Sequence, residues 1–512
     1  MLQQLLLVMS ISVGQPNTAS LEAPAASDSP SVSSANCFCP LVWLRPWKAG
    51  DLQMKPFEPT PTYAGCKGLF WCPKEEKKEN GTNEKKTSNN EQKDTPPAKK
   101  EGEKKNGEEE KKEEEPKTLT PLMQVFQCWC PSGFERMKKR DDNLYGWVQQ
   151  GFTGNFDNPR DRVNFGTNLN WRSNDYRLNQ FYLVYENTLE HNGKPNIGYR
   201  VDFVAGHDAP FFVSNGLFSS FTGFDRTSGF GVNGPASFRQ MNAIGIDLPQ
   251  FFLEAHIPNL ITDKGIDIRI GRFYTLMGRE VYPGKDTDFY SRTFENIVGT
   301  PFTHTGILGT VHATETLDVV AGVVRGWDVF EDNNNRPSYH GAFIWNSCDK
   351  RYNWTTAWIT GPEQPGNNSN YRSLVSSYLT VLFGSHNEWR IATGGSFAYE
   401  AKAAVDPING NRKDAEWGSY STHLFYTVDP RLVLGLRAEW FRDDDGTRTA
   451  FFNRPGFAAN FYDVTLGFTY KPFQNLRVRP ELRFDWTPDA RPYNDQRDRF
   501  QVTAAVDVIW EF

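Results

Sequence analysis

Apolar and polar residues alternate along much of the chain between residue 141 and the C-terminus. In the segment Leu476–Trp486, apolar side chains occupy nearly every second position and charged side chains fill the positions between them. The final segment, Phe500–Phe512, follows the same pattern, with Ala505 and Ile509 as apolar residues on its mostly polar face. Successive side chains of a β-strand point to opposite faces, so the pattern predicts strands with one apolar and one polar face.

The alternation and the intervening turn residues predict sixteen strands, an even number as bacterial outer-membrane barrels require. Long connections follow the odd-numbered strands and short ones follow the even-numbered strands, as at Thr314-Glu315. This predicts an antiparallel up-and-down barrel with both termini in the periplasm. The expected strands span 143–153, 177–187, 197–207, 246–257, 266–276, 302–313, 316–327, 338–349, 352–361, 371–383, 388–400, 416–427, 432–442, 460–470, 475–486 and 501–511.

Two features favour a transmembrane barrel over a soluble β-sandwich, which would also alternate. Aromatic residues stand at strand ends, as at Tyr462, Tyr470 and Trp486, where girdles at the lipid interfaces are expected. The chain ends in Trp510 and Phe512, and this ending resembles the signal by which the barrel-assembly machinery recognises its substrates. We therefore predict an all-β barrel in the lipid of the cell outer membrane.

Composition agrees with this fold class. Hydrophobic residues make up 38% of the chain and aromatic residues 14%. No stretch reaches the roughly 18–20 consecutive apolar residues of a membrane-spanning helix. A barrel strand needs an apolar residue only at every second position, so modest hydrophobicity is sufficient. The formal net charge of −6 gives no reason to expect a nucleic-acid partner.

The first 140 residues differ in composition from the rest. Residues 1–14 resemble a signal segment, although no Lys or Arg precedes their apolar run. Residues 15–140 are expected to form a largely disordered periplasmic extension of low complexity. Within it, residues 74–117 are mostly Lys, Glu, Asn and Gly, with too few apolar side chains to pack, and predict a solvated linker. The barrel is expected to occupy residues 141–512.

Six of the seven cysteines lie in this extension. In an oxidising periplasm they are expected to form disulfides, with the connectivity left open. Metal binding is a lesser alternative, because the Cys-x-x-Cys pairs of a zinc ribbon are absent. The sequence predicts no metal site and no cofactor. The cysteines are Cys37, Cys39, Cys66, Cys72, Cys128 and Cys130.

Charged residues on the inner face of the strands predict a water-filled lumen. A barrel of sixteen strands encloses an aqueous channel, whereas unpaired charges in a dry core would cost several kcal/mol. Both signs are present, so the sequence does not settle ion selectivity. The predicted pore-lining residues are Arg200, Asp202, Asp267, Arg269, Arg437, Glu439, Arg477, Arg479, Glu481, Arg483, Asp485 and Asp507.

The third long connection, 277–301, is expected to fold into the lumen and narrow the pore. The alternative is an ordinary solvated surface loop. Charges of both signs on this loop would set up a transverse field across the constriction. They are Arg279, Glu280, Lys285, Asp286, Asp288, Arg292 and Glu295.

Short motifs in the first half of the predicted barrel resemble the β-barrel porins of the OmpL-like, porin-2 type, common in planctomycetes. They are Tyr145-Gly-Trp-Val, Leu178-Asn-Gln-Phe-Tyr-Leu, Gly271-Arg-Phe-Tyr-Thr, Phe289-Tyr-Ser-Arg, Pro301-Phe-Thr-His-Thr-Gly and Gly322-Val-Val-Arg-Gly-Trp. The resemblance implies an outer-membrane channel and brings no catalytic or ligand residues with it. The linker and the cysteine motifs are not part of the family pattern.

Three functions follow from these observations. The first is passive diffusion of small hydrophilic solutes through a pore, in a barrel that we expect to assemble as a homotrimer. The second is a structural barrel whose N-terminal arm tethers the outer membrane to the cell wall or to a partner. The third, an enzyme in a barrel, is disfavoured, because no Gly-x-Ser-x-Gly or His-Glu-x-x-His motif occurs. His256, His304 and His312 fall in predicted strands, where pore-lining or packed histidines are expected.

Overall fold

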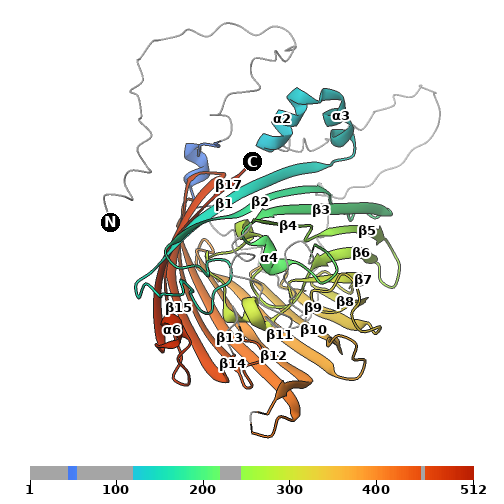
Figure 1. The fold of residues 1–512 in the computed structure, drawn as a ribbon. Coiled ribbons are helices and arrows are strands. Elements are labelled where there is room, and N and C mark those ends of the chain that lie inside the picture. Colours follow the sequence, from blue (N-terminus) through green and yellow to red (C-terminus); the bar gives the residue numbers. More distant parts are fainter. Residues whose placement is uncertain (1–43, 55–118, 219–243, 407, 451–455) are drawn as a thin grey trace, which may run out of the picture. The chain divides into compact units, whose positions relative to one another are not determined.

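A computed structural model describes residues 44–54, 119–218, 244–406, 408–450 and 456–512. One antiparallel sheet forms most of this part of the chain (Figure 1). Its strands are β1 (Asn143–Asn155), β2 (Asp175–Asn187), β3 (Asn196–Gly206), β4 (Gly245–Asp247), β5 (Phe251–Ile257), β6 (Ile266–Tyr274), β7 (Thr303–His312), β8 (Leu317–Val324), β9 (Ser338–Asn346), β10 (Tyr352–Pro362), β11 (Tyr371–Phe383), β12 (Trp389–Val405), β13 (Arg412–Asp429), β14 (Leu432–Asp443), β15 (Ala459–Phe473), β16 (Leu476–Trp486) and β17 (Phe500–Glu511).

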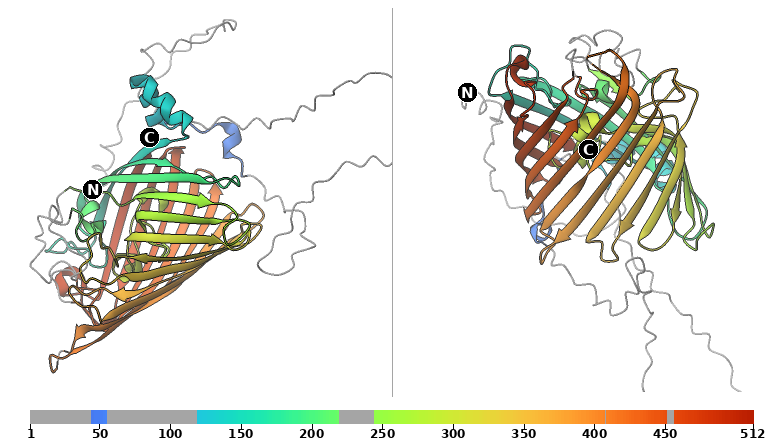
Figure 2. Two further views of the ribbon diagram at one scale, coloured as in Figure 1. Left: turned by 90° about the vertical axis from the view of Figure 1, so that its right-hand side faces the viewer. Right: turned by 90° about the horizontal axis from the view of Figure 1, so that it is seen from below.

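The sheet closes into a barrel. Strands pair with their neighbours in sequence, and β1 also pairs with β17, so the ends of the sheet meet (Figure 2). β4 and β5 both pair with β3 and together fill a single position in the wall. The wall therefore has sixteen strand positions, and the predicted antiparallel barrel of sixteen strands is confirmed.

The break between β4 and β5 has a local cause that the pattern did not reveal, since one strand was predicted over 246–257. Arg272 of β6 is fully buried beneath the break. It donates to the Asp247 carboxylate at 2.7 Å and to the Leu248 carbonyl at 2.6 Å. The Leu248 carbonyl thus binds a guanidinium in the interior instead of continuing the strand ladder.

The outer face carries a continuous apolar band. Leu253, Ile270, Ile307, Val323 and Tyr339 are in register across five neighbouring strands. Their exposed fractions are 62%, 53%, 51%, 45% and 53%. So many exposed apolar side chains in one row would be a liability in water, but they match the lipid-facing band of a membrane barrel.

β12 and β13 are longer than predicted. The sequence indicated strands at 388–400 and 416–427 with a long connection between them, but the structure continues the hairpin to Val405 and resumes it at Arg412. A bulge interrupts the pairing between Glu400 and Ala404. Polar residues such as Lys413 and Glu416 extend this end of the hairpin, so the alternation expected of a lipid-facing strand is lost there.

Two helices precede the barrel, so residues 119–140 of the predicted extension are folded. Thr120 is the N-cap of α2 (Pro121–Trp129), and its hydroxyl accepts a hydrogen bond from the Met123 amide at 3.1 Å. α3 (Pro131–Lys139) follows, and Phe134 packs with Met123 against Tyr185 of β2. The other helices among the described residues are η3 (Ala49–Leu52), α4 (Ala209–Phe212), η4 (Gly284–Asp286), η5 (Glu295–Gly299) and α6 (Tyr493–Gln496). Within the described ranges, no helix is long and apolar enough to span a membrane.

The cysteines differ in part from the prediction. Cys128 is disulfide-bonded, and so is Cys348 in the connection between β9 and β10, which lay outside the predicted set. Cys130, which was in that set, is a free and exposed thiol. It lies between α2 and α3, and its sulfur atom is close to Gly133. The other four predicted cysteines, the signal-like segment 1–14 and the linker 74–117 lie outside the described residues.

Candidate pore constriction

The connection between β6 and β7, residues 275–302, runs through the barrel interior. It carries η4 and η5, and Phe294, Ile297 and Val298 are at most 1% exposed. The Phe294 ring lies 6.0 Å from the ring of Phe441 on β14 and 5.2 Å from that of Phe461 on β15. These strands lie half-way round the barrel from β6 and β7. The loop therefore crosses the lumen to the opposite wall, as Figures 1 and 2 show.

Two wall carboxylates hold the loop by its backbone amides. Glu481 of β16 accepts from Tyr290 N at 2.9 Å and from Ser291 N at 3.0 Å. Glu439 of β14 accepts from Phe294 N at 2.6 Å and from Glu295 N at 2.8 Å. Each carboxylate satisfies two successive amides that would otherwise be buried without partners, which fixes the course of the loop.

Wall arginines hold the loop by its carbonyl oxygens. Arg437 of β14 donates to Ser291 O at 2.9 Å, and Arg479 of β16 donates to Thr287 O at 2.6 Å. Arg483 of β16 donates to the carbonyl of Arg292. Because an arginine presents several donors in a fixed plane, it can bind the loop and a neighbouring carboxylate together. Glutamates and arginines thus alternate on β14 and β16, and they form hydrogen bonds with the backbone of the loop.

The predicted pore-lining residues fall into two groups. Those on β14, β16 and β17 are mostly buried beneath the loop and contact it or one another: Arg437, Glu439, Arg479, Glu481, Arg483, Asp485 and Asp507. Arg477 of β16 is more exposed and binds Lys285 O and Glu511. On the other wall, Arg200 pairs with Asp202 and Glu186, Arg269 pairs with Glu254, and Asp267 contacts three histidines.

One protein family, described as "Putative beta-barrel porin-2, OmpL-like", matches residues 143–512 of the chain. The chain belongs to this porin family. It is accordingly an outer-membrane channel through which small solutes diffuse, and not an enzyme. A comparison with curated protein sequences finds no match.

Several solved structures of outer-membrane channels are similar to this chain at low sequence identity. The channel DcaP of Acinetobacter baumannii is 12% identical, with 72% of this porin and 97% of that chain covered and a TM-score of 0.46. Pseudomonas putida OprB is 13% identical, with 75% and 97% covered and a TM-score of 0.46. An anion-selective porin from Comamonas acidovorans is 12% identical, with 72% and 99% covered and a TM-score of 0.47.

Most charges of the porin's loop are paired. Asp288 lies between Arg279, at 3.1 Å, and Arg390 of β12. Burial would raise the pKa of Asp288, but the two guanidinium groups hold it below its usual value. Glu280 binds Arg437 at 3.1 Å, and Lys285 binds Asp286 at 2.7 Å.

Two loop charges are buried deeply. The Arg292 side chain donates to Thr287 Oγ1 at 2.9 Å and to Phe289 O at 2.9 Å, so it braces the loop from within. Glu295 contacts the Tyr378 hydroxyl of β11, and burial raises the pKa of its carboxyl group. Neither side chain faces open water, because Arg292 and Glu295 are at most 2% exposed.

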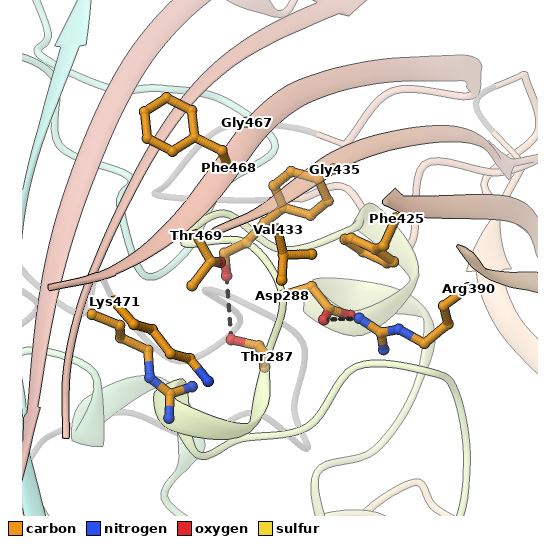
Figure 3. A pocket seen from close by; sticks show the side chains of 12 residues that line it. Thr287, Asp288, Arg390, Phe425, Val433, Gly435, Gly467, Phe468, Thr469 and Lys471 are labelled. Atoms are coloured by element: carbon orange, nitrogen blue, oxygen red, sulfur yellow. Dashed lines mark hydrogen bonds and ion pairs between the residues drawn. The ribbon is translucent and has the colours of Figure 1, made fainter. Parts of the chain in front are cut away.

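A cavity of about 190 Å³ remains between the loop and the wall. Thr287, Asp288 and Phe289 line one side of it, and residues of β12–β16 line the other. Figure 3 shows Asp288 and Arg390 facing each other there, with Lys471 at the opposite end. The charged residues that line the cavity are the anion Asp288 and the cations Arg390, Lys471 and Arg477. The lining therefore has an excess of positive charge.

Several loop contacts were not predicted from the sequence. Trp417 of β13 donates to Gly299 O at 3.0 Å, and Arg448 donates to Val298 O at 2.8 Å. Alternation reveals which face a residue occupies but not which distant loop it meets. One usable signal was Phe441, an aromatic residue on the polar face between Glu439 and Asp443. An aromatic side chain turned into the lumen indicates that something packs there.

Proposed function

We propose that solutes pass through this porin beside the loop 275–302, which acts as the constriction. The observation that carries the proposal is the attachment of the loop to the far wall through the paired amide bonds of Glu439 and Glu481. A loop tied at both walls divides the lumen and leaves a narrow passage at its side. The cavity beside Asp288 supports a passage at this place.

The excess of positive charge around this cavity favours anions in the passage, because nearby fixed charge raises the local concentration of counter-ions. Replacing Lys471 with glutamate removes one cation and adds one anion. We expect the reversal potential in a salt gradient across a planar bilayer to shift toward cation preference. Lys350→Glu, an equal charge reversal in the connection between β9 and β10, is the control and should shift it much less. Equal shifts in both variants would contradict a passage along this cavity.

We infer a second role for the N-terminal extension, as a periplasmic arm that tethers the barrel to the cell wall or to a partner. The favouring observation is a short segment that binds the rim of the barrel. Arg45 N donates to Asn475 Oδ1 at 2.8 Å, Gln474 N donates to Arg45 O at 2.7 Å, and the Trp47 indole donates to Lys471 O at 2.9 Å. A segment bound at the rim would transmit a pull on the arm to the barrel.

Deletion of residues 20–118 tests this role and keeps the helices that pack on β2. We expect normal assembly and unchanged single-channel conductance, with increased release of outer-membrane vesicles from the cells. A variant in which 74–117 is scrambled at constant length and composition is the control, because a spacer depends on length alone. Normal vesicle release from the deletion variant would rule out a tether.

Other features stay predictions from the sequence: a signal segment at 1–14, homotrimeric assembly, planctomycete-type ancestry, and recognition of Trp510 and Phe512 by the barrel-assembly machinery. The place of Phe512 suits such a signal. Its amide donates to Gly146 O at 2.8 Å and its carbonyl accepts from Gly146 N at 2.9 Å, so it closes the seam between the first and last strands.

A further inference from the structure

Four metal-ligating side chains converge at the end of the barrel where β1 begins and β17 ends. His256 lies near the end of β5, Asp267 near the start of β6 and His312 at the end of β7, so three come from neighbouring strands. The fourth, His191, lies in the connection between β2 and β3. One nitrogen or oxygen atom from each lies within 4.8 Å of the others.

The distances within this cluster are close to those of a tetrahedral metal site. An Asp267 oxygen lies 2.7 Å from His256 Nδ1, and the other oxygen lies 2.9 Å from His191 Nε2 and 3.0 Å from His312 Nε2. With bonds of about 2.0–2.1 Å, tetrahedral ligand atoms around Zn²⁺ stand roughly 3.3 Å apart. Small side-chain movements would therefore admit the ion without any change in the strands.

A second carboxylate orients one of the histidines from behind. His312 Nδ1 lies 2.8 Å from Asp318 Oδ1 on β8. A neutral imidazole has one N–H, and if Nδ1 donates it to Asp318, the lone pair of Nε2 points at the Asp267 oxygen. The lone pair and the Asp267 oxygen repel each other, because both carry negative charge. A metal ion between them would bind both atoms and remove this repulsion. A histidine that ligates a metal usually has such a carboxylate on its other nitrogen.

Three side chains of the cluster are largely buried in the barrel wall, and the fourth is exposed to solvent. The side chains of His256, Asp267 and His312 are 2%, 17% and 19% exposed, whereas that of His191 is 49% exposed. Three ligands are thus held by the wall, and the fourth comes from a loop on the solvent side. An ion can arrive from water, and its binding would fix the loop 188–195 against the wall.

We propose that His191, His256, Asp267 and His312 form a binding site for a transition-metal dication, with Zn²⁺ as the preferred ion. Imidazole ligands suit Zn²⁺ and its neighbours, whereas Ca²⁺ and Mg²⁺ take oxygen ligands. The sequence alone predicts no metal site, and the strand pattern predicts pore-lining or packed roles for His256 and His312. The four residues are spread over more than a hundred positions, and only the closed barrel brings them together.

The test is calorimetric titration of the full-length porin in detergent with ZnCl₂, using a tag without histidines and alkylated thiols so that cysteines cannot bind the ion. We expect one Zn²⁺ per chain. His256→Gln combined with His312→Gln should abolish this binding, and Asp318→Asn should weaken it by about 10- to 100-fold. His386→Gln, which changes an exposed histidine of another turn, is the matched control and should bind as the wild type does.

Heat-dependent gel migration shows whether each variant is folded. If the double variant does not fold, the visible spectrum of the wild-type porin loaded with Co²⁺ decides, because tetrahedral Co²⁺ absorbs intensely and octahedral Co²⁺ only weakly. A weak octahedral spectrum, absence of stoichiometric Zn²⁺ binding to the wild type, or unchanged binding in a folded double variant would each overturn the proposal. The four residues would then be a hydrogen-bonded cluster only.

Discussion

Replacing Glu439 and Glu481 with glutamine should raise the single-channel conductance and make it fluctuate. Each carboxylate accepts two backbone amides of the loop, and a glutamine can accept only one, because its own NH₂ group would face the other amide. A hydrogen bond to a charged group contributes about 1.5–3 kcal/mol. Loss of one such bond at each residue should allow the loop to leave the wall and open the passage.

Planar-bilayer recordings of the double variant measure this effect directly. Glu400→Gln is the matched control, because Glu400 is a buried wall carboxylate that pairs with Arg372 of β11 and has no bond to the loop. We expect it to leave conductance unchanged. If the double variant conducts as steadily as the wild type, the loop is not the constriction, or it is held by its other contacts alone.

Replacing Arg272 with methionine should destabilise the barrel by about 3–5 kcal/mol, the usual cost of removing one partner from a buried ion pair. Arg272 and Asp247 are both fully buried, and the guanidinium also donates to the carbonyls of Leu248 and Phe212. Without it, the Asp247 carboxylate stays in the interior with no counter-charge, and the break between β4 and β5 loses its support.

Urea unfolding in detergent, followed by gel migration, measures this loss. Arg269→Met is the control, because Arg269 lies on the same strand and pairs with Glu254, but its side chain is 36% exposed. An exposed pair contributes no more than about 1 kcal/mol. Arg272→Met combined with Asp247→Leu should recover part of the stability, since no charge is then left unpaired. Equal stability of the two single variants would refute the importance of burial.

The wall of this porin was predictable from its sequence because a membrane strand obeys a local rule. Lipid-facing positions are mostly apolar, so Leu466 and Leu482 can be assigned to the outer face from their neighbours alone. The rule weakens where a strand continues with polar residues on both faces, as in the β12–β13 hairpin. It also fails where a side chain interrupts the ladder, as Arg272 does between β4 and β5.

The interior was predictable only in part. Charges at Arg437 and Glu481 indicated the inner face, but no local rule states that their partners are the backbone of residues 290 and 291. The histidine cluster is a similar case, since its members come from three strands and a separate loop. Alternation specifies a direction for each side chain, whereas contact across a closed barrel depends on where distant strands come to lie.

The attachment of the loop to β14 and β16 also bears on how the channel is made. The amides of Phe294 and Tyr290 lie 145 and 191 positions before the glutamates that bind them. Contacts so remote in sequence form late in folding, because a long chain segment must first be ordered. We therefore expect the loop to reach its partners only when β14 and β16 are in place, so that the constriction is completed late in assembly.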